Sequence, residues 1–141
     1  MKPVIQEETT GCGFAAVATL AGVTYRHVRR AAHTLNISAA DARLWSDTVY
    51  IRRLLAHYGI HAVAGEVKFV TWDRLPSKAL LAIKWHRSKG RACWHWVVFW
   101  RGPHGEVVLD SKRSLRSNRR TDFNRMSPKW FIRIEEPIAP G

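Results

Sequence analysis

The sequence predicts an α+β fold in which N-terminal helices precede, and pack on, a C-terminal antiparallel sheet. Two observations support this: apolar residues recur at helical spacing up to Gly59, and short β-branched and aromatic runs follow it. The 141 residues are enough for one domain with its own core, since 46% of them are hydrophobic and seven are tryptophan. We therefore expect a single domain over 1–136 and a short Pro/Gly-containing tail over 137–141.

Three helices are expected before Gly59. Thr9 and Thr10 are candidate N-caps for a helix from Cys12 to about Ala21, which Gly22 ends. A second helix begins after Thr24 and ends at Asn36. Its apolar positions at i, i+3, i+4 and i+7 are Val28, Ala31, Ala32 and Leu35. A third helix runs from about Ser46 to Tyr58, and its expected apolar contacts are Val49, Leu54, Leu55 and Tyr58.

Five strands are expected after Gly59. They cover residues 60–64, 79–85, 93–100, 106–110 and 129–136. The GPHG segment at 102–105 predicts a tight turn that joins two of these strands as a hairpin. A turn there would bring position 97 opposite 108, and position 95 opposite 110. The polar, basic stretch 111–125 predicts an exposed loop.

The most unusual bulk feature is charge. The chain has 23 Lys and Arg against 11 Asp and Glu, a formal net charge of +12. Such a surface should attract polyanions without reading their sequence. Trp100 and Trp130 lie on either side of the basic stretch 111–125 in the sequence. Their rings could stack on the bases of a nucleic acid and so add to that attraction.

The sequence contains no pattern typical of a cofactor, a metal or a membrane span. His57, His61, His86 and His104 lack ligand spacing, and the two cysteines form no CxxC pair. A single Cys12–Cys93 bridge is the one disulfide that two cysteines allow. No signal-like segment opens the chain and no apolar run could span a bilayer, which predicts a cytoplasmic protein. Export that needs no signal would leave no trace in the sequence.

Cys12 stands out as a candidate nucleophile. A thiol attacks as thiolate, and the free N–H groups at a helix start favour that negative charge. Gly11 and Gly13 flank the cysteine, so a substrate could approach the sulfur closely. Gln6, six residues upstream, carries an amide that could donate a hydrogen bond to an oxyanion. The alternative is a small buried cysteine in an Ala-rich helix.

His95 and Asp110 are the candidate partners of Cys12. Alternation along the 93–100 strand places His95 on one face, and Trp94 and Trp96 on the other. An imidazole in so apolar a strand is either a hydrogen-bonded core residue or a base with a partner. The expected hairpin would make Asp110 the cross-strand neighbour that orients it. Nucleophile, base and orienting acid then follow in the chain order of papain-like folds.

The segment QEETTGCGFAAVA (6–18) resembles the active-site opening of the bacteriocin-processing cysteine peptidases that cut double-glycine leader peptides. HWVVF (95–99) and GEVVLD (105–110) are similar to that family's strands bearing the catalytic His and Asp. The match covers roughly residues 4–112. The chain departs from the family at Gly11, where an Asp is common near the Cys-Gly pair, and at Ser111, where a Pro is common.

The resemblance implies a papain-like cysteine peptidase fold with Cys12, His95 and Asp110 as the triad and Gln6 at the oxyanion. It implies that no cofactor is needed. It also implies a peptide or protein substrate, of which a leader peptide is one option. The same triad would also serve an amidase, a deamidase or a transglutaminase, including a toxic effector that acts on another protein. A different class remains open: a basic module on the same scaffold that binds nucleic acid or an acidic partner.

Overall fold

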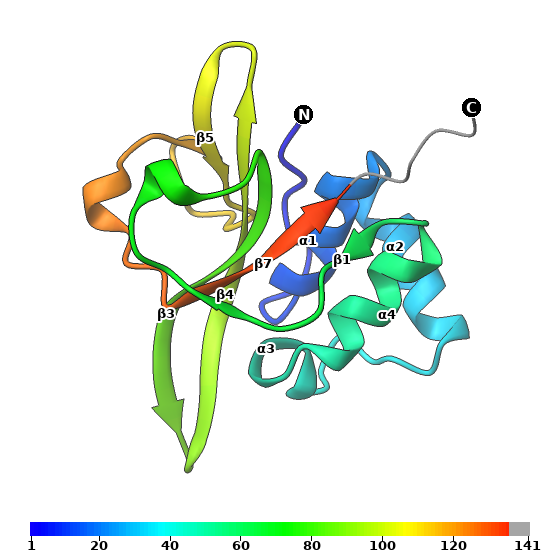
Figure 1. Ribbon diagram of the computed structural model, residues 1–141. Helices are drawn as coiled ribbons and strands as arrows, with labels where there is room; N and C mark the ends of the chain where they lie inside the picture. Colours follow the sequence, from blue (N-terminus) through cyan, green and yellow to red (C-terminus); the bar gives the residue numbers. More distant parts are fainter. Residues whose placement is uncertain (136–141) are drawn as a thin grey trace.

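The computed structural model describes residues 1–135. Within that range four α-helices lie to one side of an antiparallel sheet, which confirms the predicted α+β class (Figure 1). The helices are α1 (Cys12–Ala21), α2 (Tyr25–Thr34), α3 (Arg43–Ser46) and α4 (Val49–His57). The strands are β1 (His61–Ala62), β2 (Val67–Lys68), β3 (Lys78–Ser88), β4 (Arg91–Gly102), β5 (Gly105–Leu109), β6 (Arg119–Arg120) and β7 (Trp130–Glu135). None of the helices described is long and apolar enough to cross a bilayer.

Helix α1 has the bounds that the sequence predicts, and Gly22 ends it in the left-handed conformation. Its start is capped differently from the prediction. Gly11 is the N-cap and no side chain caps the helix, because Thr9 and Thr10 lie in a turn that the Gly11 N–H closes onto the Glu8 carbonyl at 3.0 Å. The expected threonine caps are therefore wrong.

Helix α2 begins as predicted, with the Thr24 hydroxyl accepting a hydrogen bond from the His27 N–H. The third helix, predicted from about Ser46 to Tyr58, is α4, which starts later, at Val49, and ends at His57. The short helix α3 before it is not predicted. Val49 is 55% exposed, whereas Ile51 is fully buried. The stripe that faces the core therefore consists of buried Ile51, Leu54 and Leu55 and partly buried Tyr58. This i, i+3, i+4, i+7 pattern leaves Val49 on the solvent face.

The sheet has the strand order β1-β7-β3-β4-β5-β6, with β2 also paired to β7, and every pair is antiparallel. Strands β3 and β4 extend beyond their predicted ends. Strand β7 pairs with β3 only as far as Ala82, and β5 pairs with β4 only from Val98 onward. Residues 83–95 therefore form a two-stranded ribbon, the hairpin arm, which projects from the sheet at the bottom of Figure 1.

The β4–β5 hairpin forms, but in a register two positions away from the predicted one. Phe99, not position 97, lies opposite Val108. The reason is the turn: Pro103 and His104 are its two loop residues, and Gly102 pairs with Gly105. Strand β5 ends at Leu109, so Asp110 reaches His95 from beyond the paired region, along a diagonal across β4.

The predicted exposed loop over 111–125 is partly wrong. Arg119–Arg120 forms strand β6, which covers the edge of β5, and residues 123–125 form a 3-10 turn. An open sheet edge leaves backbone groups unpaired, and β6 satisfies some of them. The end of the last predicted strand at Glu136 and the tail 137–141 lie outside the described residues.

Both faces of the sheet carry a core. Trp94, Trp96 and Val98 face the helices, while Val97 and Phe99 pack on the opposite face, as the predicted alternation requires. The buried Trp96 indole donates a 2.7 Å hydrogen bond to the Leu44 carbonyl. This bond fixes α3 against β4, directly beside the start of α1.

Candidate active site

The N-terminus of α1 lies against the part of β4 that β5 leaves unpaired. A Cβ on Gly13 would be 3.6 Å from the Trp96 ring, so the start of the helix lies close to this strand. Cys12 is the first residue of α1 and is 6% exposed. The first helical hydrogen bond runs from the Ala15 N–H to the Gly11 carbonyl at 3.0 Å. The preceding N–H groups, including that of Cys12, have no partner within the helix.

His95 lies on β4 between two tryptophans that face the helices, and its side chain is 16% exposed. The imidazole Nε2 is 2.8 Å from Asp110 Oδ1. The Cys12 thiol lies close enough to the imidazole to raise the pKa of His95, through side-chain hydrogen bonding and its charge. The structure therefore brings the three predicted triad residues together, in the order cysteine, histidine, aspartate.

Asp110 is fully buried and has three donors. Oδ1 accepts from His95 and, at 3.1 Å, from the Lys112 backbone N–H; Oδ2 accepts from Arg120 Nη1 at 3.0 Å. The backbone is held too, because Asn118 donates from its side chain to the Asp110 carbonyl at 2.7 Å. A carboxylate held at this many points can fix the orientation of the imidazole.

The charges of this cluster support one another. Burial alone would lower the pKa of His95, but the hydrogen bonds to Asp110 and Cys12 outweigh it and raise that pKa to about 9. Burial alone would raise the pKa of Asp110, but the bonds from His95, Lys112 and Arg120 hold it at about 2. At neutral pH the site therefore holds an imidazolium between the Cys12 sulfur and a carboxylate.

Gln6 lies beside this cluster, but its amide is already engaged. Nε2 donates to the carbonyls of Glu8 and Thr9 at 2.9 and 3.0 Å. Oε1 accepts from the Ser111 hydroxyl at 2.9 Å, and the Gln6 backbone N–H donates to the Ser111 carbonyl. Gln6 thus joins the loop before α1 to the segment after Asp110. To serve an oxyanion, it must give up one of its two carbonyl bonds.

A pocket of about 410 Å³ opens beside His95. Gln6 and Thr9 contribute to one wall, and Lys84 and Lys112 to another. The imidazole lines this pocket, whereas Cys12 is buried and is not one of the lining residues. A substrate group in the pocket would therefore touch the candidate base directly.

Sequence reasoning missed Arg120 and Lys84. Arg120 occurs in the run SNRRTD, where nothing distinguishes it from the exposed Arg119 beside it. Only the pairing of β6 with β5 turns its guanidinium toward Asp110. Lys84 occurs within a predicted strand, and its place in the pocket depends on a bulge that local sequence patterns do not reveal.

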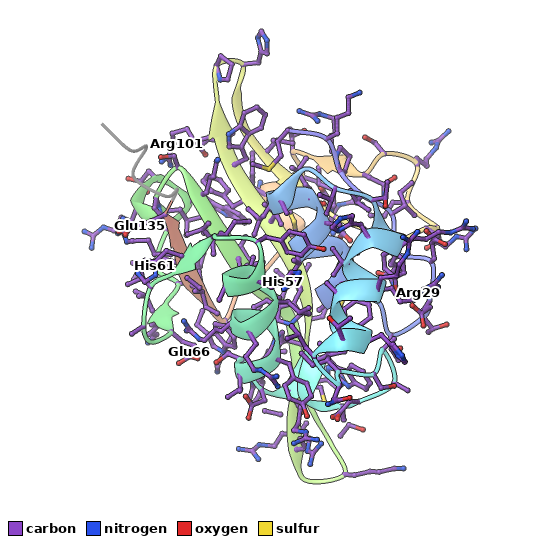
Figure 2. All side chains as sticks on the ribbon, turned by 90° about the vertical axis from the view of Figure 1, so that its right-hand side faces the viewer. Arg29, His57, His61, Glu66, Arg101 and Glu135 are labelled. Carbon is purple, nitrogen blue, oxygen red and sulfur yellow. The ribbon has the colours of Figure 1, made fainter. Side chains whose placement is uncertain are left out.

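The remaining candidates lie elsewhere. Cys93 is a free thiol like Cys12, so the two cysteines form no disulfide. His57 on α4 and His61 on β1 come from different elements, and His61 lies beside Glu135 at the sheet edge (Figure 2). Among residues 1–135, no three or more His, Cys, Asp and Glu side chains gather in a way that could hold a metal ion.

Gly11 is required by close packing just before Cys12. A Cβ there would overlap the hydroxyl of the buried Tyr25, which donates a 2.6 Å hydrogen bond to Glu8. We expect Gly11→Ala to displace Tyr25 and to lower the free energy of unfolding by about 1–3 kcal/mol. Urea denaturation checks this, and Gly22→Ala, which has open space around it but a positive φ, is the control for a purely conformational cost. A Gly11→Ala protein as stable as the parent would contradict it.

Comparison with models of known protein families, with curated proteins and with solved structures finds no match to this chain.

Proposed function

We propose that this protein is a papain-like cysteine hydrolase that cleaves a peptide bond. The observation that carries the proposal is the continuous hydrogen-bonded series Cys12–His95–Asp110, assembled from a helix start, a strand and the end of the next strand. A buried carboxylate that orients an imidazole, which in turn contacts a thiol, is the arrangement that nucleophilic catalysis requires.

In the proposed reaction the Cys12 thiolate attacks the carbonyl carbon of the scissile bond. His95, protonated beside it, gives its proton to the leaving amine as the C–N bond breaks and a thioester forms. Water then adds to the thioester, His95 accepts its proton, and the C–S bond breaks. Asp110 keeps the imidazole oriented through both steps.

The oxyanion that forms in each step needs donors. The Cys12 backbone N–H at the open start of α1 is one, and a Gln6 amide hydrogen released from a backbone carbonyl is the second. The hydrogen bond that Gln6 releases is one that holds the loop at Glu8 and Thr9. Substrate binding would therefore loosen that loop.

Within this class the peptide substrate rests on the resemblance to the leader-peptide-processing family. A leader peptide is accordingly one proposed substrate. Hydrolysis or deamidation of a side-chain amide uses the same triad and the same steps, and only the group held in the pocket differs.

A second candidate function is binding of a polyanion. The observation that favours it is the exposed basic surface of the hairpin arm, which carries Arg87, Lys89 and Arg91 beyond the edge of the sheet. This function would not involve the Cys12 thiol. Oligonucleotide binding that persists in Cys12→Ala would therefore support polyanion binding independently of the hydrolase proposal.

Selective alkylation tests the hydrolase proposal. Cys12 and Cys93 are almost equally buried, 6% and 8% exposed, so burial does not favour either. The Cys93 thiol donates a hydrogen bond to the uncharged Arg91 carbonyl at 3.5 Å, whereas Cys12 lies beside an imidazole whose pKa is raised to about 9. We expect iodoacetamide at pH 6 to label Cys12 at least about tenfold faster than Cys93.

The labelled residue is identified by mass spectrometry of the digested protein. The preference should fall in His95→Gln and disappear in urea, where both thiols are exposed. Equal labelling of the two cysteines in the folded protein would refute the proposed role of Cys12.

A further inference from the structure

Two lysine ammonium groups meet at the wall of the pocket beside His95. Lys84 from β3 and Lys112 from the segment after Asp110 both line this pocket, and Lys112 is close enough for its charge to act on Lys84. Burial, followed by the neighbouring charge of Lys112, lowers the pKa of Lys84. Both side chains are exposed, so solvent screens much of the repulsion between these like charges, and an anion bound between them would remove the rest.

The backbone at Lys84 explains why its side chain is in the pocket. Between the pairs Ile83–His95 and His86–Cys93, β3 contains one more residue than β4, which makes a β-bulge. Lys84 occupies that bulge with a φ of 54°. A bulge redirects a side chain out of the regular alternation, and here it turns the ammonium group toward the candidate base.

Among residues 1–135, neither lysine forms an ion pair with a carboxylate. Asp110 attracts Lys84, but its oxygens already accept bonds from His95 and Arg120. Arg113 lines the same wall and has no ion-pair partner in this range either. The basic wall therefore has a surplus of positive charge.

The two acids that line the same pocket, Glu7 and Glu8, do not supply the missing charge. Glu8 accepts from the Tyr25 hydroxyl at 2.6 Å and lies 3.8 Å from Arg29. Glu7 lies 3.6 Å from Arg26. Both arginines belong to α2, and Figure 2 shows Arg29 on the outer side of the helical layer. Among residues 1–135, both acids therefore pair with arginines of α2, and neither forms an ion pair with Lys84 or Lys112.

We propose that the wall formed by Lys84, Lys112 and Arg113 is a carboxylate-binding subsite, so that the substrate has an acidic group next to the bond that Cys12 attacks. This inference rests on the proposed hydrolase function and specifies its substrate class. A carboxylate would bridge the two ammonium groups and end their repulsion. Because His95 lines the same pocket, the bound group would place the neighbouring carbonyl beside the triad.

A comparison of two alkylating agents isolates this charge effect. Iodoacetate and iodoacetamide both form an S–C bond and release iodide, but only iodoacetate carries a carboxylate. The rate ratio of iodoacetate to iodoacetamide at Cys12 should fall about tenfold in the double variant Lys84→Met, Lys112→Met. The matched control, Lys68→Met with Lys89→Met, removes the same charge from exposed sites, and Lys89 shares the positive φ of Lys84. It should change the ratio by less than about twofold.

Small ligands test the subsite without requiring a reactive thiol. Three probes are titrated into the Cys12→Ala protein, with the side-chain signals of Lys84, Lys112 and His95 followed by NMR. N-acetyl-glutamate N-methylamide presents an acidic side chain, N-acetyl-glutamine N-methylamide is its neutral counterpart, and N-acetyl-alanine presents a chain-end carboxylate. The subsite is supported if a carboxylate probe causes saturable shifts, the glutamine compound does not, and the shifts are lost in the Lys84, Lys112 double variant. The acid that binds more tightly then shows whether the subsite takes an acidic side chain or a chain-end carboxylate.

The outcomes separate the two proposals. If Cys12 is not alkylated selectively but the carboxylate shifts appear, the subsite is supported and the hydrolase role of Cys12 fails. If Cys12 is alkylated selectively but neither the rate ratio nor the shifts depend on Lys84 and Lys112, the subsite is refuted alone. The subsite would also be refuted if both double variants lowered the rate ratio equally and an oligonucleotide displaced the probes. That result would indicate a general polyanion-binding surface.

Discussion

Cys12→Ala is expected to lower peptide hydrolysis by about 10⁴-fold or more. The sulfur is the only proposed nucleophile, and removing one member of a catalytic triad typically costs a rate factor of this size. The measurement is cleavage of a peptide library rich in Asp and Glu, followed by mass spectrometry of the products. His95→Ala should cause a loss of similar size, and the double variant should be little worse than either single one, because the two residues act as a unit.

Cys93→Ala is the matched control for this experiment. Cys93 is almost equally buried and is also a free thiol, but its hydrogen bond goes to the Arg91 carbonyl within the hairpin arm and not to an imidazole. Its removal should leave the cleavage rate within about twofold of the parent rate. Cleavage that survives in Cys12→Ala and is lost in Cys93→Ala would contradict the assignment of the nucleophile.

Asp110→Asn is expected to cause the largest loss of stability of any single substitution in the site. It removes the buried negative charge between His95 and Arg120, and breaking a buried pair by removing one partner typically costs about 3–5 kcal/mol. For a chain of this length the melting temperature should fall by on the order of 10 °C. Thermal unfolding followed by circular dichroism gives the shift directly.

The loss should depend on pH in a defined direction. The pKa of His95 is raised from 6.5 to about 9, so its contribution is fully present below pH 6.5 and is lost as the pH rises through 9. The pKa of Asp110 is lowered from 3.8 to about 2, so its contribution is present above pH 3.8 and is lost as the pH falls through 2. The difference in melting temperature should therefore be greatest between pH 3.8 and 6.5 and should shrink above pH 9.

Asp122→Asn provides the comparison. Asp122 binds the same Arg120 guanidinium, at 2.8 and 3.0 Å, but its side chain is 41% exposed. An exposed ion pair contributes no more than about 1 kcal/mol, so this variant should melt within a few degrees of the parent. If Asp110→Asn and Asp122→Asn had equal effects at every pH, the buried charge of Asp110 would not be what stabilises the site.

Local sequence patterns predict the elements that carry the candidate site. The Ala-rich run between Gly11 and Gly22 predicts α1 with its first residue at Cys12, because helix ends are encoded by residues next to them. Alternation predicts that His95 faces away from Trp94 and Trp96. The turn residues at 102–105 predict the hairpin that brings Asp110 near His95, although the register differs by two positions.

Local patterns in the chain are enough to predict α1, α2, most of α4 and the long strands, since these depend on contacts within a few residues. The short helix α3 is not predicted, nor is it predicted that β6 turns Arg120 onto Asp110, that Gln6 is bonded to Ser111, or that a bulge turns Lys84 into the pocket. These are contacts between segments distant in the chain, or a single inserted residue in a strand. Their geometry follows from how loops close and sheets pair, which no local pattern of residue types records.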